Sequence, residues 1–197
     1  MVNGSRHRRT RLRREWGIVD GSPRVTSGPN DAIRVQWHLL LAELLCDQDQ
    51  AANADTELAA IDPKQLKACG DDIQAETALT RARVQMLNHN PQAAALQYDI
   101  AAEHWQAAGR YGDMVRALEQ AGHAYEDTGN SPAAVDRYYR SARSLFESGQ
   151  LARARDLTDR ALPLAAASHQ PDLQRQVERL KAEIDRKQQK VIAADKK

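Results

Sequence analysis

The sequence predicts an all-α protein built as an α-solenoid, that is, a row of antiparallel helix pairs. Composition is the first observation that supports this fold class. Of the 197 residues, 42% are hydrophobic and only 5% are aromatic. Residues that favour helices are abundant and runs of β-branched residues are few, so the balance favours helices over strands. The second observation is a pattern that repeats every 20 residues over much of the chain, which is the sequence signature of stacked repeats.

Glycine marks the repeat most clearly. Gly109, Gly129 and Gly149 stand 20 residues apart, and His89 and His169 continue the series on either side. A glycine takes the left-handed backbone conformation that closes a helix without steric cost. Proline suits the first turn of a helix, and it stands just after three of these positions, at Pro91, Pro132 and Pro171.

Between these turns, each row of 20 residues has the pattern of one amphipathic helix. A column of small residues contains Ala82, Ala102, Gly122 and Ala142, and columns of large residues contain Tyr98, Leu118 and Tyr138, and Trp105, Tyr125 and Leu145. Offsets of three and four place these columns on one helical face. The pattern predicts six antiparallel helices over residues 71–190, with turns near residues 89–91, 109–112, 129–131, 149–150 and 169–171.

One stretch of this pattern resembles the tetratricopeptide repeat. The family's large, small and aromatic positions fall on Leu118, Ala121, Gly122 and Tyr125 of a first helix, with the turn glycine at Gly129. The positions of its second helix fall on Ala134, Tyr138 and Ser141, and they recur at Ala94, Tyr98 and Ala101 and, weakened, at Ala154, Thr158 and Ala161. The resemblance covers about residues 75–168 and implies a right-handed superhelix of helix pairs.

The chain departs from the family in two respects. A helix pair here takes about 40 residues, whereas the family's unit has about 34, and Phe146 stands where the family usually has proline. The chain therefore resembles the long-helix relatives of the fold.

The segment before the repeats, residues 31–70, is expected to be helical. Residues 31–46 read as a buried helix with Asp31 as N-cap and with six large apolar residues: Ile33, Trp37, Leu40, Leu41, Leu44 and Leu45. The same stretch ends at Cys46 and could instead be the hydrophobic part of a lipoprotein signal. Glu43 interrupts the apolar run and bulky leucines precede the cysteine, which favours the helix.

The ends of the chain differ in charge from its middle. Residues 1–30 hold seven arginines against two acids, residues 31–170 sum to −7, and residues 171–197 sum to +3. We expect residues 1–30 to be a disordered basic leader, although arginines in this number could also contact nucleic acid or anionic lipid.

At the other end, the repeats are expected over residues 71–170, followed by an amphipathic capping helix and a charged tail over residues 171–197. The stripe of this helix holds Leu173, Val177, Leu180, Ile184 and Val191. A weak homodimer through residues 172–191 is the alternative role of the same stripe. Within the repeats, Pro163 is expected to kink or end its helix.

No spacing of residues typical of an active site is present, so we expect neither catalysis nor a cofactor. The six histidines are scattered, and two cysteines, Cys46 and Cys69, are too few for a zinc site and are expected to be reduced. No stretch reaches the ~20 apolar residues of a membrane-spanning helix.

The function expected from these observations is a non-catalytic scaffold that binds a peptide or helical segment of another protein in a concave groove. The resemblance places the groove on the first helices of the pairs, where it would be lined by Arg83, Met86, Arg116, Glu119, His123, Glu126, Arg155 and Asp159. These residues lack the two-lysine, asparagine and arginine set by which some relatives hold a C-terminal carboxylate. Mixed charges suggest a charged or amphipathic segment, and nucleic acid is not expected as a partner.

An alternative function uses the same repeats near a membrane, in a bacterial envelope lipoprotein or assembly accessory. The expected location is the cytoplasm for the scaffold, and the periplasm or a lipid anchor for the alternative.

Overall fold

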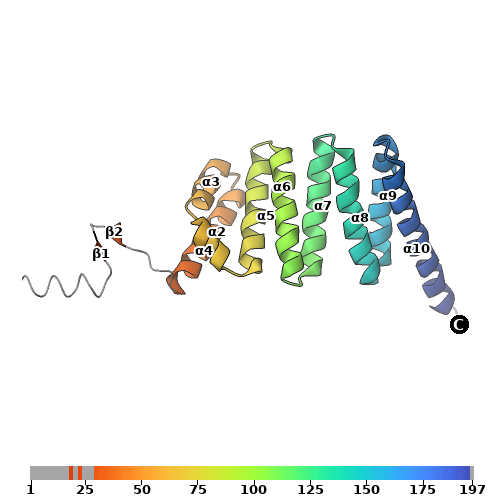
Figure 1. Cartoon of the computed structure of the whole chain (residues 1–197), viewed down its shortest axis with the longest axis horizontal. Helices are drawn as coiled ribbons and strands as arrows, with labels where there is room; N and C mark the ends of the chain where they lie inside the picture. The colour runs from red at the N-terminus through yellow and green to blue at the C-terminus, as the bar shows by residue number, and fades with distance from the viewer. Residues whose placement is uncertain (1–17, 20–21, 24–28, 196–197) are drawn as a thin grey trace, which may run out of the picture.

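The helices stand side by side in a row, as Figure 1 shows for this computed structural model. The structure describes residues 18–19, 22–23 and 29–195. At one end of the row lie α2 (Pro29–Asp47), α3 (Ala51–Ala59) and α4 (Pro63–Ala68). The row continues with α5 (Asp71–Leu87), α6 (Pro91–Ala107), α7 (Tyr111–Asp127), α8 (Ser131–Glu147), α9 (Leu151–Ala167) and α10 (Pro171–Asp195). The predicted all-α solenoid and its six helices are confirmed.

The described part of the chain also contains two very short strands. They are β1 (Ile18–Val19) and β2 (Ser22–Pro23), which pair antiparallel. The predicted disordered leader falls largely on residues 1–17, 20–21 and 24–28, which lie outside the described residues.

The 20-residue period arises from helices of 17 residues joined by three-residue links. The helices α5 to α9 each have 17 residues. The third glycine of the series shows how each helix closes: Gly149 has a φ of 80°, and the amide of Gln150 donates a hydrogen bond of 2.8 Å to the carbonyl oxygen of Leu145. This is the bonding pattern of a glycine-closed helix end. The histidines of the series, His89 and His169, also take positive φ, at 56° and 55°.

The predicted packing columns form the core. Every member of the small column is buried, and the ring of Tyr138 is among the largest fully buried side chains. A Cβ atom added to Gly122 would lie 2.5 Å from Cε1 of Tyr138. The ring of Tyr138 on α8 therefore packs directly against the backbone of α7 at Gly122. The two helices can approach this closely only because residue 122 has no side chain.

The N-terminal segment is helical as predicted, but its expected buried face is wrong. Val35, Leu39, Ala42 and Cys46 form the buried side of α2, whereas four of the six residues expected in the core are exposed: Ile33, Trp37, Leu40 and Leu44. The side of α2 that carries Val35, Leu39, Ala42 and Cys46 packs into the core, so the opposite side, with Trp37 and three other large residues, points away from the row.

The N-cap prediction for Asp31 is also wrong, and of the two outcomes expected at Pro163, a kink or a helix end, the structure excludes the end. Asp31 is not an N-cap, because α2 begins at Pro29; Asp31 lies in its first turn and accepts a hydrogen bond of 3.0 Å from Gln65. Pro163 does not end its helix, because α9 continues to Ala167. The proline is exposed, so water can reach the carbonyl of Asp159 that loses its partner.

The C-terminal helix packs as a cap. Val177, Leu180 and Ile184 are buried and belong to the same clusters as core residues of α8 and α9. The stripe over residues 172–191 is therefore largely occupied within the chain, and no finding supports the predicted homodimer through it.

The contact between Gly122 and Tyr138 yields a test of the packing. Replacing Gly122 by Ala should lower the free energy of unfolding by about 1–3 kcal/mol, because the added methyl group forces the ring or the helices apart. Urea unfolding followed by circular dichroism measures this change.

Gly112 in the first turn of the same helix is the matched control. An added Cβ there meets nothing within 4 Å, so Gly112→Ala should be neutral or stabilising by up to about 1 kcal/mol. An equal loss in the free energy of unfolding for the two variants would contradict the close approach at Gly122.

Candidate interaction faces

The first helices of the pairs, α5, α7 and α9, carry all eight residues predicted for the groove. The structure does not gather them into one continuous site, because their side chains point to different neighbours. Some pair across to the next odd-numbered helix, and others pair with α2 or α10. The solvent-facing side of α5, α7 and α9 that carries these eight residues is called the odd face below.

On α5 the two predicted residues differ in their surroundings. Nη2 of Arg83 lies 2.5 Å from Oδ1 of Asp47, so this arginine ties α5 to the end of α2. Met86 is exposed one turn further along the helix. The end of α5 therefore offers one apolar contact beside a charge that is already paired.

On α7 two of the predicted residues join it to α9. Glu119 accepts a hydrogen bond of 3.0 Å from Arg153, and the carboxylate of Glu126 accepts two from Arg160, at 3.1 and 2.5 Å. These bonds lower the pKa of Glu126, with Arg160 as the main cause. Arg116 pairs with Asp113 on its own helix and keeps 72% of its side chain exposed.

On α9 the two predicted residues face away from α7. Nε of Arg155 lies 3.4 Å from Oδ1 of Asp185, and Asp159 pairs with Lys181. Both partners belong to α10, so these residues fasten the C-terminal cap. Sequence reasoning missed Arg153 and Arg160, which are the residues of α9 that reach α7.

His123, which was predicted to line the groove, has a packing role. Its Nδ1 lies 3.2 Å from the hydroxyl oxygen of Tyr138, and the two rings meet edge to face with centroids 5.6 Å apart. Burial, and then the charge of Arg160, lower the pKa of His123. Burial, and then the charge of Glu126, raise the pKa of Tyr138.

The polar group around Tyr138 is one of three similar arrangements, which we call arginine bridges. In each, an arginine lies over an aromatic ring of the preceding helix and pairs with a carboxylate two helices back. Arg137 on α8 is 5.2 Å from the ring centroid of Tyr125 and bonds both oxygens of Asp99 on α6, at 2.8 and 2.6 Å. The other two bridges consist of Arg110, Trp105 and Asp72, and of Arg160, Tyr138 and Glu126.

A separate surface lies on the outer side of α2, and sequence reasoning missed it. Its exposed residues are Ile33 (62%), Trp37 (67%), Leu40 (63%) and Leu44 (53%). We call these four residues the α2 stripe. The sequence contained a signal for this surface. A second apolar series on the opposite face of α2 also recurs at offsets of three and four: Val35, Leu39, Ala42 and Cys46.

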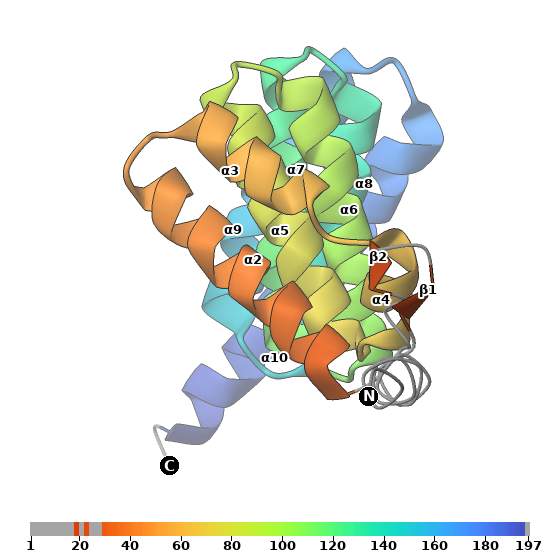
Figure 2. The ribbon, with the colours of Figure 1, turned by 90° about the vertical axis from the view of Figure 1, so that its left-hand side faces the viewer.

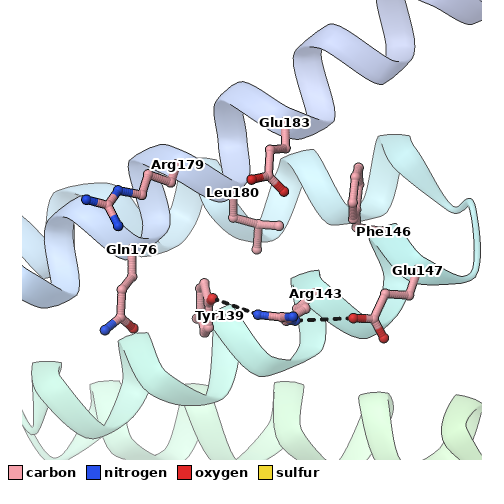
Figure 3. Close-up of a pocket in the computed structure, with 8 residues that line it drawn as sticks. All are labelled: Tyr139, Arg143, Phe146, Glu147, Gln176, Arg179, Leu180 and Glu183. Atoms are coloured by element: carbon pink, nitrogen blue, oxygen red, sulfur yellow. Dashed lines mark hydrogen bonds and ion pairs between the residues drawn. The ribbon is translucent and has the colours of Figure 1, made fainter.

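A shallow cavity of about 250 Å³ lies between α8 and α10. Figure 3 shows Arg143 between the hydroxyl of Tyr139 and the carboxylate of Glu147. Phe146 and Leu180 also line the cavity. Because charges of both signs line the cavity and Arg143 is already paired, it defines no single class of ligand.

Among the described residues, no group of three or more histidine, cysteine, aspartate or glutamate side chains is arranged to hold a metal ion. Over the same residues, no helix has the length and apolar character needed to cross a membrane. Both cysteines are free thiols, and burial raises the pKa of Cys46.

Fold and surfaces together define a helical-repeat protein, a solenoid of antiparallel helix pairs. No protein-family model and no curated protein matches the chain. Among solved structures, it is similar to the crystal structure of a Podosopora anserina kinesin light chain with nearly identical TPR-like repeats. The two are 17% identical, the match covers 86% of this chain and 92% of that chain, and the TM-score is 0.39.

The surroundings of His123 predict how stability depends on pH. Its neighbours are Arg160 on α9, Tyr138 on α8, and Glu119, Glu126 and Asp127 on α7. The pKa in the folded chain is below the value of 6.5 in the unfolded chain, so the unfolded chain takes up the proton first. Neutral His123 therefore stabilises the folded chain above pH 6.5. This stabilisation is lost as the pH falls through the pKa of His123 in the folded chain.

Urea unfolding of the wild type and of His123→Gln between about pH 7.5 and 5 isolates this contribution. The wild type should lose stability relative to the variant as the pH falls. A constant difference across this range would show that His123 titrates alike in both states.

Proposed function

We propose that the chain is a non-catalytic scaffold that binds a peptide or helical segment of another protein along the odd face. The observation that carries the proposal is the set of cross-helix ion pairs on this face. Arg110 joins α7 to Asp72 on α5, and Arg153 and Arg160 join α9 to α7. Charged side chains from three alternate helices, α5, α7 and α9, are thus held in place before a partner binds.

Held side chains favour binding because less conformational entropy is lost when the partner docks. The arginines of this face keep donor groups free while they are paired. Arg153 and Arg160 each pair with one carboxylate and remain about half exposed, and Arg116 is exposed further still. A guanidinium group has five donors, so each arginine can hold its partner on α7 and bind an acceptor from outside.

The partner that fits this face carries charges of both signs and at least one apolar side chain. Arginines supply donors, carboxylates such as Asp156 supply acceptors, and Met86 supplies an exposed apolar contact at the end of α5. Recognition of this kind is typical of extended or helical segments lying across a solenoid.

The test selects ligands from a library of random peptides of about 16 residues, long enough to span three helices. Selected peptides are then titrated calorimetrically against the wild type and against Arg116→Glu combined with Met86→Glu. The double variant should bind at least about tenfold more weakly, because reversed charge opposes the ligand. Its free energy of unfolding should stay within about 1 kcal/mol of the wild type, because Arg116 is largely exposed and Met86 is more than one-third exposed.

The control is Glu103→Arg, an exposed charge reversal on α6, outside the odd face; it should leave the affinity unchanged. His123 is left intact because its ring packs on Tyr138. Selected peptides that bind the folded double variant as tightly as the wild type would show that the odd face is only a solvated surface.

A further inference from the structure

The two ends of the solenoid differ in what they present to solvent. At the C-terminal end, the outer side of α10 is polar, with exposed Arg175, Glu178 and Arg186. At the N-terminal end, α2 and α3 lie in front of α5 in Figure 2, and the α2 stripe faces outward. A solenoid needs a polar outer face on its terminal repeats, since an apolar one attracts a further unit. Among the described helices, the outer side of α10 meets this requirement over most of its length, and its exposed apolar residues, Val191 and Ile192, lie only near its end.

The stripe is a regular seam on one side of α2. Its members follow one another at spacings of four, three and four residues, so they line one face of the helix. The buried residues of α2, such as Val35 and Leu39, lie on the opposite side and already contact the rest of the row. Within residues 29–195, the stripe is therefore not part of the core.

We propose that the α2 stripe is covered by the same stripe of a second copy of this chain, in a closed dimer joined at the N-terminal ends. A head-to-tail contact would place the stripe against the charged outer side of α10 and would leave its apolar surface without apolar contacts. A contact between identical ends has no such mismatch, and a twofold axis limits the assembly to two copies.

The spacing of the stripe suits an antiparallel pair of α2 helices. The spacings between successive stripe residues, four, three and four, are the same in both chain directions. Each apolar residue of one copy therefore lies opposite an apolar residue of the other copy. Trp37 lies opposite Leu40 of the second copy, and Ile33 lies opposite its Leu44. Asp47 at the end of the helix is paired with Arg83 on α5, so it takes no part in the seam.

The area of the stripe indicates a weak dimer. Four large side chains more than half exposed offer on the order of 500 Å² per copy, so two copies bury about 1,000 Å², near the lower limit for a specific interface. We expect a dissociation constant in the micromolar range or weaker, with monomer and dimer in exchange.

Sedimentation equilibrium of the full chain from about 1 to 200 μM tests the proposal, because this range brackets a micromolar constant. The wild type should pass from monomer to dimer as the concentration rises. Leu40→Lys should raise the dissociation constant at least about tenfold, because it buries an unpaired charge at the centre of the seam. The control Leu96→Lys changes an exposed leucine of α6 and should dimerise as the wild type does.

Thermal melts of the dilute proteins show that both variants fold. Three outcomes overturn the proposal: a wild type that stays monomeric over the whole range, a dimer that Leu40→Lys leaves intact, and species larger than a dimer. In the first case, quenching of tryptophan fluorescence by an added amphipathic helical peptide, if Trp37→Phe abolishes it, would assign the stripe to a different protein.

Discussion

The arginine bridges supply the constraint on which the stack of helices depends. Helices that follow one another form hairpins, which three-residue links and local packing hold together. A solenoid also needs each helix fixed relative to the helix two steps away, and the backbones of α5 and α7, of α6 and α8, and of α7 and α9 make few close contacts. Long side chains span that gap, as Arg137 does between α8 and Asp99 on α6. Arg110 and Arg160 repeat the arrangement at their own positions.

An aromatic ring stands at the centre of each bridge for a physical reason. The small residues of one helix leave room for a ring of the next, as Gly122 does for Tyr138. A tyrosine inserted in this way must satisfy its hydroxyl group, and Tyr125 donates to Asp99 at 2.9 Å. The arginine then covers the ring and neutralises the same carboxylate, so apolar packing and charge pairing stabilise one geometry together.

The sequence predicts the helices and their core well because these depend on local rules. Gly109, Gly129 and Gly149 close helices, and alternation of small and large residues specifies the packed face. The arginine bridges could not be predicted, because Arg110, Arg137 and Arg160 follow no fixed period and their partners lie 34 or 38 residues away.

The candidate surfaces could be predicted only in part. The residues predicted for the groove all lie on α5, α7 and α9, but the direction of a long charged side chain depends on which neighbour carries its counter-charge. Arg155 and Asp159 consequently point to α10. On α2 two apolar faces compete, and the face that carries Val35 and Leu39, without the tryptophan, forms the contact with the row.

The central claim, that arginine bridges fix alternate helices, is tested most directly by a double-mutant cycle on Asp99→Asn and Arg137→Met, read out by urea unfolding. A half-buried bidentate pair should give a coupling of about 1–3 kcal/mol, against about 0.5 kcal/mol or less for the exposed pair of Arg143 and Glu147 within α8. Equal coupling for the two pairs would contradict the account.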